Sequence, residues 1–213
     1  MKYRKEKKLI IEIGKMLYNK NFVASNDGNI SMRISDDEVL ITATGISKGA
    51  MRYQDIITID MEGHVVDGKN KPSSEYKMHL EVYKKRKDVM ACVHAHPQKT
   101  TAFSICDLDL NEVILPEVVL SIGNIGVADY ASPSSKKLAE IIGEKAADYN
   151  AILLSNHGAL TMGKDLYDAY YKMETLEHYF SIKLYTKILG NAKVLPGEEI
   201  AHLFDIRKSV YGK

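Results

Sequence analysis

The stretch Ala91-Cys92-Val93-His94-Ala95-His96-Pro97 carries the strongest information on both fold and chemistry. Its apolar residues predict a buried strand over 89–96, and Pro97 fits the end of that strand because proline cannot continue the pairing of a sheet. Side chains two residues apart in a strand point to the same face. The sequence therefore predicts that the His94 and His96 imidazoles converge on one point.

Two converging imidazoles indicate a metal site, since neutral imidazole is a good ligand for zinc and similar divalent metals. Histidine pairs near strand ends are also common on surfaces, so this pair alone leaves metal binding open. His157 follows the apolar run 151–154 and stands in Asn156-His157-Gly158, where a strand ends in a tight turn. It reads either as a hydrogen-bonded loop histidine or as a third ligand. Three ligands leave one coordination position open, which is the arrangement of a catalytic zinc.

Glu75 is the fourth candidate, in the first turn of a helix that we expect to begin at Pro72-Ser73-Ser74. Proline suits the first helical turn, and serine caps the free N–H groups there. A carboxylate beside zinc can act as a general base or can fill the open coordination position. The helix dipole alone also favours a glutamate at this place, so the residues leave both interpretations open. His79, one helical turn later, lies on the same face and is a candidate indirect partner of the site.

Three short loops have the chemistry to bind phosphate. Ser73 and Ser74 offer hydroxyl and N–H groups at a helix start, which is a ready anion site. Glycine lets the backbone approach a ligand closely in the other two loops. These loops are Gly28-Asn29 and Thr44-Gly45. Each of the three is also ordinary turn chemistry when taken by itself.

The rest of the chain alternates short strands with helices. Hydrophobic spacing predicts helices over 3–19, 134–147 and 165–189. Strands or extended segments are expected over 39–43, 55–60, 64–66, 113–122, 151–154 and 159–162. Helices at both ends and in the middle, with strands between, predict a mixed α/β sheet covered by helices, as one domain over 1–213.

Composition narrows the class of protein. The chain has 213 residues, 45% of them hydrophobic, and a formal net charge of +1, so charge gives no case for nucleic acid or an anionic membrane as partner. No apolar run is long enough to span a bilayer, and the N-terminal residues lack a cleavage site. The two cysteines are too few for a disulfide framework. We therefore expect a cytoplasmic protein.

Taken in order, these motifs resemble the class II aldolase and adducin family, and within it the L-fuculose-1-phosphate aldolases. The matching stretches are Asp27-Gly28-Asn29-Ile30-Ser31-Met32-Arg33, Thr44-Gly45, Pro72-Ser73-Ser74-Glu75 with Met78-His79, Val93-His94-Ala95-His96, Tyr130-Ala131-Ser132 and Asn156-His157-Gly158. Several ordered motifs over nearly the whole chain are far more specific than any single one.

The resemblance implies a three-layer α/β/α fold with a largely antiparallel central sheet, assembled as a homotetramer with active sites between subunits. It implies Zn²⁺ held by His94, His96 and His157, with Glu75 moving a proton. The substrate phosphate would be bound by Gly28, Asn29, Thr44, Gly45, Ser73 and Ser74. The implied reaction of carbohydrate metabolism is cleavage of a ketose 1-phosphate, of the L-fuculose 1-phosphate type, to dihydroxyacetone phosphate and a small aldehyde such as lactaldehyde.

Two details of the sequence bear on which activity of the family this chain has. The related pentulose-phosphate 4-epimerases usually carry aspartate at the place of Glu75, which favours an aldolase or a dehydratase here. The fuculose aldolases place a tyrosine of a neighbouring subunit near the aldehyde, whereas residues 116–121 contain none. Tyr211 is a candidate match for a second family tyrosine. The alternatives are a 5-deoxyribulose-1-phosphate aldolase, a methylthioribulose-1-phosphate dehydratase, or a non-catalytic adducin-like interaction domain.

Overall fold

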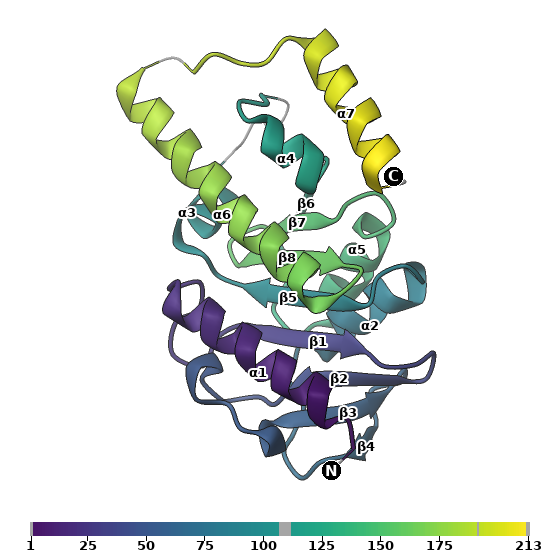
Figure 1. The fold of residues 1–213 in the computed structure, drawn as a ribbon. Helices are drawn as coiled ribbons and strands as arrows, with labels where there is room; N and C mark the ends of the chain where they lie inside the picture. Colours follow the sequence, from purple (N-terminus) through teal and green to yellow (C-terminus); the bar gives the residue numbers. More distant parts are fainter. Residues whose placement is uncertain (1, 107–111, 191, 212–213) are drawn as a thin grey trace.

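The computed structural model describes residues 2–106, 112–190 and 192–211, and an eight-stranded sheet forms its centre (Figure 1). The order across the sheet is β4-β3-β2-β1-β5-β8-β7-β6, and every neighbouring pair is antiparallel except β6 with β7. The strands are β1 (Asn29–Arg33), β2 (Glu38–Thr42), β3 (Ile56–Asp60), β4 (Val65–Asp67), β5 (Ala91–Ala95), β6 (Ile125–Ala128), β7 (Ala151–Leu154) and β8 (Gly158–Gly163).

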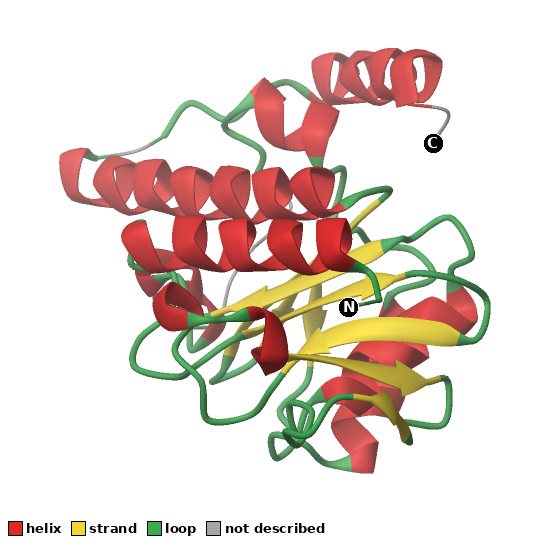
Figure 2. Cartoon of the chain, turned by 60° about the horizontal axis from the view of Figure 1, so that its bottom comes forward, coloured by secondary structure: helices red, strands yellow, loops and turns green. Residues whose placement is uncertain are grey.

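Helices cover both faces of this sheet, so the expected three-layer α/β/α fold with a largely antiparallel sheet is confirmed (Figure 2). One face carries α1 (Arg4–Asn19) and α6 (Leu166–Leu189), and the other carries α2 (Tyr76–Lys85) packed against α5 (Lys136–Lys145). The remaining helices are α3 (Gln98–Ser104), α4 (Pro116–Ser121) and α7 (Gly197–Tyr211), with short 3-10 turns η1 (Lys48–Ala50) and η2 (Tyr53–Asp55). The predicted helices over 3–19, 134–147 and 165–189 are therefore confirmed.

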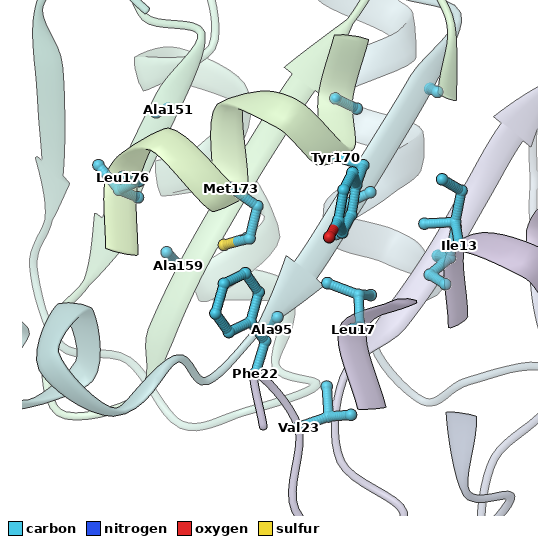
Figure 3. Close-up of a cluster of buried hydrophobic side chains, with 14 of the residues drawn as sticks. Ile13, Leu17, Phe22, Val23, Ala95, Ala151, Ala159, Tyr170, Met173 and Leu176 are labelled. Atoms are coloured by element: carbon cyan, nitrogen blue, oxygen red, sulfur yellow. The ribbon is translucent and has the colours of Figure 1, made fainter. Parts of the chain in front are cut away.

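The central strand β5 is buried along its whole length because both faces are covered. Val93 and Ala95 face the α1 and α6 layer, where they join a cluster that includes Leu17 and Tyr170 (Figure 3). Cys92 belongs to the opposite cluster, under α2 and α5. Strand alternation therefore turns the His94 side chain toward α2, the helix that follows Glu75.

The segment 113–122, predicted to be extended, is instead partly helical. Helix α4 covers Pro116–Ser121, with proline at its first turn. Val118 and Val119 are buried, and the helix packs against α7. Proline pre-sets the backbone of a first helical turn, and tertiary packing outweighed the extended preference of the valines. Helices α3 and α7 and strands β1 and β6 had no prediction from the sequence.

The helix predicted to begin at Pro72 begins later, at Tyr76. Pro72 forms an isolated β-bridge with Ala43, and the Ser73 N–H donates to the Thr42 carbonyl at 2.9 Å. The prediction of a serine cap at Pro72-Ser73-Ser74 was therefore wrong in detail, since these residues extend alongside the end of β2. As a result, Ser73 lies beside the end of β2 rather than in a helical turn.

Strand register gathers the candidate residues at one end of the sheet. Asn29, the first residue of β1, pairs with His94 near the end of β5. Ala95 in turn pairs with Ala159, next to the β7–β8 turn that carries His157. Separately, no helix in the described ranges is long and apolar enough to cross a membrane.

Candidate active site

His94, His96 and His157 form one cluster, in which the candidate ligand atoms lie within 4.8 Å of one another. The Nε2 atoms of His94 and His96 are 3.1 Å apart, and the three ring centroids are separated by 4.8 to 5.0 Å. His94 is fully buried, while the side chains of the other two are partly exposed. The predicted convergence of the strand pair is therefore observed, and the turn histidine joins it.

Polar contacts at Nδ1 orient two of these rings, those of His94 and His96. Nδ1 of His94 donates a hydrogen bond to the Ala159 carbonyl at 2.9 Å, which leaves Nε2 facing the cluster. Nδ1 of His96 is 3.4 Å from a carboxylate oxygen of Asp27. Such outer partners orient imidazole ligands in metal sites.

The Glu75 carboxylate completes the cluster from the other face. Its two oxygens lie 3.3 Å from Nε2 of His94 and 3.5 Å from Nε2 of His157. Burial alone would raise the pKa of Glu75, but the charge of His94, with hydrogen bonds from His94 and Asn29, holds it well below its usual range. The carboxylate is therefore ionised at neutral pH, and its buried Oε1 has no hydrogen-bond partner among the described residues.

A buried chain of hydrogen bonds leads away from Glu75. The Asn29 amide donates to Glu75 Oε2 at 2.9 Å and accepts at Oδ1 from Nε2 of His79. Nδ1 of His79 lies 2.6 Å from the Ser31 hydroxyl, which lies 2.7 Å from the Tyr83 hydroxyl. Burial, with the charge of His94, lowers the pKa of His79 to about 3, so this ring stays neutral. The predicted indirect role of His79 can therefore act through Asn29, which links the His79 ring to Glu75. The Asn29 side chain points toward Glu75.

The three loops expected to bind phosphate lie at the same end of the sheet. Gly28 has φ +73°, and a Cβ there would stand 2.8 Å from the His94 carbonyl oxygen, so glycine is required. The Thr44 N–H donates to the Lys71 carbonyl, which joins the second loop to the third. The third loop is adjacent to the carboxylate, because the Glu75 N–H donates to the Ser73 hydroxyl at 3.3 Å.

The donor set fits a divalent metal. Burial, together with the charge of His94, lowers the pKa of His96 to about 3 and that of His157 to about 4. Both of these rings are neutral at pH 7, as metal ligands must be, whereas the Glu75 carboxylate raises the pKa of the buried His94, so a metal would displace the proton from that ring. Nitrogen lone pairs 3.1 Å apart, beside an ionised carboxylate, require a cation between them or a proton on one ring. Three histidines and an adjacent carboxylate are the ligand types that bind catalytic zinc.

Comparison with known proteins identifies the family. Residues 8–184 match the family model described as Class II Aldolase and Adducin N-terminal domain. The chain belongs to the class II aldolase and adducin family. The resemblance deduced from the ordered motifs is therefore confirmed, and the family's enzymes include lyases.

Relatives within the class II aldolase family carry different names. The chain is 36% identical to a 3-oxo-tetronate 4-phosphate decarboxylase of Haemophilus influenzae over 204 residues, which cover 94% of this chain and 92% of the relative. It is 37% identical to an L-fuculose phosphate aldolase of Methanocaldococcus jannaschii over 179 residues, covering 84% of this chain and 96% of the relative. A solved L-fuculose 1-phosphate aldolase superposes with a TM-score of 0.90 at 30% identity, with 98% of each chain covered.

Several residues of the site were not found from the sequence. Asp27, beside His96, and Ser31 entered only as members of a stretch that matches the family, with no role of their own. Tyr83 was assigned only to the apolar side of a helix, although Ser31 and Tyr83 anchor the hydrogen-bond chain that ends at Glu75. A spacing pattern cannot show such links, because they cross between elements that only the folded sheet brings together. The side chain of Tyr211 lies outside the described residues.

Proposed function

We propose that this protein is a zinc-dependent aldolase that cleaves a ketose 1-phosphate to dihydroxyacetone phosphate and a small aldehyde. The observation that carries the proposal is the cluster of three imidazoles with an ionised carboxylate, one buried oxygen of which has no hydrogen bond from any residue that the structure describes. A non-catalytic interaction domain would gain nothing from burying that carboxylate beside histidines of lowered pKa. The physiological substrate is of the L-fuculose 1-phosphate type.

His94, His96 and His157 would hold the metal through their Nε2 atoms. When bound there, zinc supplies a Lewis acid that stabilises the negative oxygen of an enediolate. Ala159 and Asp27 keep the His94 and His96 rings in place through their Nδ1 atoms.

Glu75 would carry the proton. In cleavage, water takes the proton of the C4 hydroxyl, the C3–C4 bond breaks, and the electron pair stays on the dihydroxyacetone phosphate fragment as an enediolate. Glu75, which is ionised in the resting site, takes up a proton from water and delivers it to C3; in the reverse direction the ionised carboxylate removes that proton. The Asn29 amide holds one carboxylate oxygen and leaves the other free for this transfer.

The phosphate would lie among the three loops, with Gly28, Asn29, Thr44, Gly45, Ser73 and Ser74 as its neighbours. Thr44, Gly45 and Ser74 are exposed, so a ligand can reach them from solvent. The positive φ of Gly28 and of Gly45 (+73° in both) turns the backbone at the points where a phosphate would approach. Phosphate binding at this end of the sheet places the reacting carbons next to Glu75.

A second candidate reaction is decarboxylation of a four-carbon 3-oxo acid 4-phosphate. Loss of CO₂ leaves the same dihydroxyacetone phosphate enediolate, so the metal and Glu75 serve both reactions. Aldol cleavage also needs a group that takes the C4 hydroxyl proton, whereas a carboxylate leaves without one. The lack of a tyrosine in residues 116–121 and the relative from Haemophilus influenzae favour this alternative.

One experiment separates these reactions. The zinc-loaded protein is incubated with L-fuculose 1-phosphate, 5-deoxyribulose 1-phosphate, methylthioribulose 1-phosphate and 3-oxo-tetronate 4-phosphate in turn. Dihydroxyacetone phosphate and CO₂ are measured separately. Aldol cleavage predicts dihydroxyacetone phosphate with an aldehyde and no CO₂. Release of neither product from any substrate, with zinc bound, would count against both proposals.

The assembly is proposed to be a homotetramer with active sites at subunit contacts. The C-terminal end of α6 supports this, because it exposes apolar side chains that a subunit contact would bury. Tyr185 is 54% exposed, Ile188 73% and Leu189 87%. Sedimentation at micromolar concentration tests this assembly, and a monomer of 23.9 kDa would contradict it.

A further inference from the structure

Lys48 is a buried lysine that the sequence did not single out. It begins η1 shortly after the second phosphate loop, with Ile46 and Ser47 between, and only 1% of its surface is exposed. Its ammonium donates to the Asn26 carbonyl at 3.0 Å and to the Ile46 carbonyl at 2.6 Å. Asn26 precedes Gly28-Asn29, and Ile46 follows Thr44-Gly45. One side chain therefore joins the two glycine loops.

The charge of Lys48 lacks a close carboxylate. No carboxylate oxygen of the described residues forms an ion pair with its ammonium, and Asp27 acts on it only at longer range. Burial lowers the pKa of Lys48 to about 8, and the charge of Asp27 opposes this shift. A buried ammonium without a counter-charge is costly. An anion that binds near it is therefore stabilised more by the charge than an anion near an exposed lysine would be.

The position of this charge is suited to the substrate. The ammonium of Lys48 binds the Asn26 carbonyl, and the carboxylate of the next residue, Asp27, lies 3.4 Å from Nδ1 of His96. A shallow hollow lies between the two loops that Lys48 joins, and its lining includes Asn26, Gly45 and Ser47. Backbone N–H groups and a buried positive charge beside such a hollow are the elements of a phosphate site.

We propose that Lys48 is a positioning residue for the substrate phosphate, because it fixes the spacing of the two glycine loops and supplies the counter-charge for the dianion. This inference rests on the proposed function for the presence of a phosphate. The Lys48 ammonium would give the phosphate a positive charge, and the residues of the three loops carry no such charge. A purely structural lysine would instead tie the loops without favouring phosphorylated ligands.

The test compares Lys48→Met with Lys15→Met, which removes the same charge from an exposed side chain of α1. Inorganic phosphate binding to the zinc-loaded proteins is measured by calorimetry. The Michaelis constant and turnover are measured for deuterium exchange into dihydroxyacetone phosphate. We expect Lys48→Met to weaken phosphate binding and raise the Michaelis constant at least tenfold, with turnover and zinc content near wild type. Lys48→Arg should restore most of the affinity, and Lys15→Met should match wild type.

Phosphate affinity within twofold of wild type in folded Lys48→Met would overturn the proposal. An equal loss of zinc and phosphate with a lowered unfolding midpoint would assign Lys48 a structural role only and overturn it too. If Lys48→Met does not fold, Lys48→Gln keeps an N–H donor for the carbonyls but lacks the charge, and the same tenfold loss is expected. If the wild-type protein binds phosphate but cleaves no sugar phosphate, the proposed function is wrong and the inference on Lys48 still stands. A wild type that binds no phosphate would overturn this inference.

Discussion

Replacing Glu75 with glutamine removes one negative charge from the site while preserving the size of the side chain. The structure indicates how the amide would sit. Its oxygen can keep the hydrogen bond from Asn29, now at 2.9 Å, and its NH₂ group would then replace Oε1, the oxygen without a partner. The fold should therefore be little affected, with a stability change below about 1 kcal/mol, because the hydrogen bond from Asn29 is kept and the new NH₂ group replaces an oxygen that already lacks a partner among the described residues.

The effect on catalysis should be much larger. A positioned general base contributes roughly 10²- to 10⁴-fold to rate, which corresponds to about 3–5 kcal/mol of the barrier. Zinc should remain bound, because the three imidazoles are unchanged. We therefore expect Glu75→Gln to retain about one zinc per chain and to lose at least a hundredfold in proton exchange on the ketone product.

The assay follows deuterium incorporation into dihydroxyacetone phosphate by NMR in D₂O, with zinc measured by mass spectrometry. It needs no aldehyde, so it applies whichever substrate is physiological. Glu140→Gln is the matched control, since it makes the same change in an exposed side chain of α5. Exchange within tenfold of wild type, in a variant that holds zinc, would refute the role of Glu75 as base. Loss of the fold would show that Glu75 is structural.

Three further predictions follow from the geometry. His157→Ala should weaken zinc binding at least tenfold, measured by competition with a chelator, and unchanged affinity would remove His157 from the ligand set. Gly28→Ala should lower the free energy of unfolding by about 2 kcal/mol or more, because φ is +73° and the Cβ would stand 2.8 Å from the His94 carbonyl oxygen. Urea unfolding measures this free energy, and an unchanged value would show that the loop relaxes. At pH 8 only Cys106 should react with a thiol reagent in the native protein, since burial raises the pKa of Cys92 to about 12 and the thiolate is the reactive form; two rapidly reacting thiols would contradict this.

The parts of the site that follow chain periodicity could be predicted from the sequence. Strand alternation placed His94 and His96 together, and the apolar run before His157 placed it at a strand end. Both interpretations needed only local spacing. The same reasoning failed for residues 113–122, where valines favoured an extended chain but packing against α7 produced helix α4.

The contacts that tune the site could not be predicted. The Asn29 side chain reaches Glu75 across 46 positions of sequence, and Lys48 reaches the Asn26 carbonyl across 22. Such contacts depend on the register of β1 with its neighbours and on the path of the loops. The sequence assigns Asn29 only to a loop with the chemistry to bind phosphate. Its hydrogen bond to the Glu75 carboxylate is visible only in the folded structure.

The central claim is that three imidazoles and Glu75 form one site with the phosphate loops. It is tested most directly by a crystal structure of the zinc-loaded protein with a phosphorylated hydroxamate, which mimics the enediolate. We predict zinc at about 2.0–2.1 Å from Nε2 of His94, His96 and His157, with the hydroxamate oxygens completing its coordination. The phosphate should lie between Gly28, Gly45 and Ser73. Zinc bound elsewhere, or a phosphate outside these loops, would contradict the account.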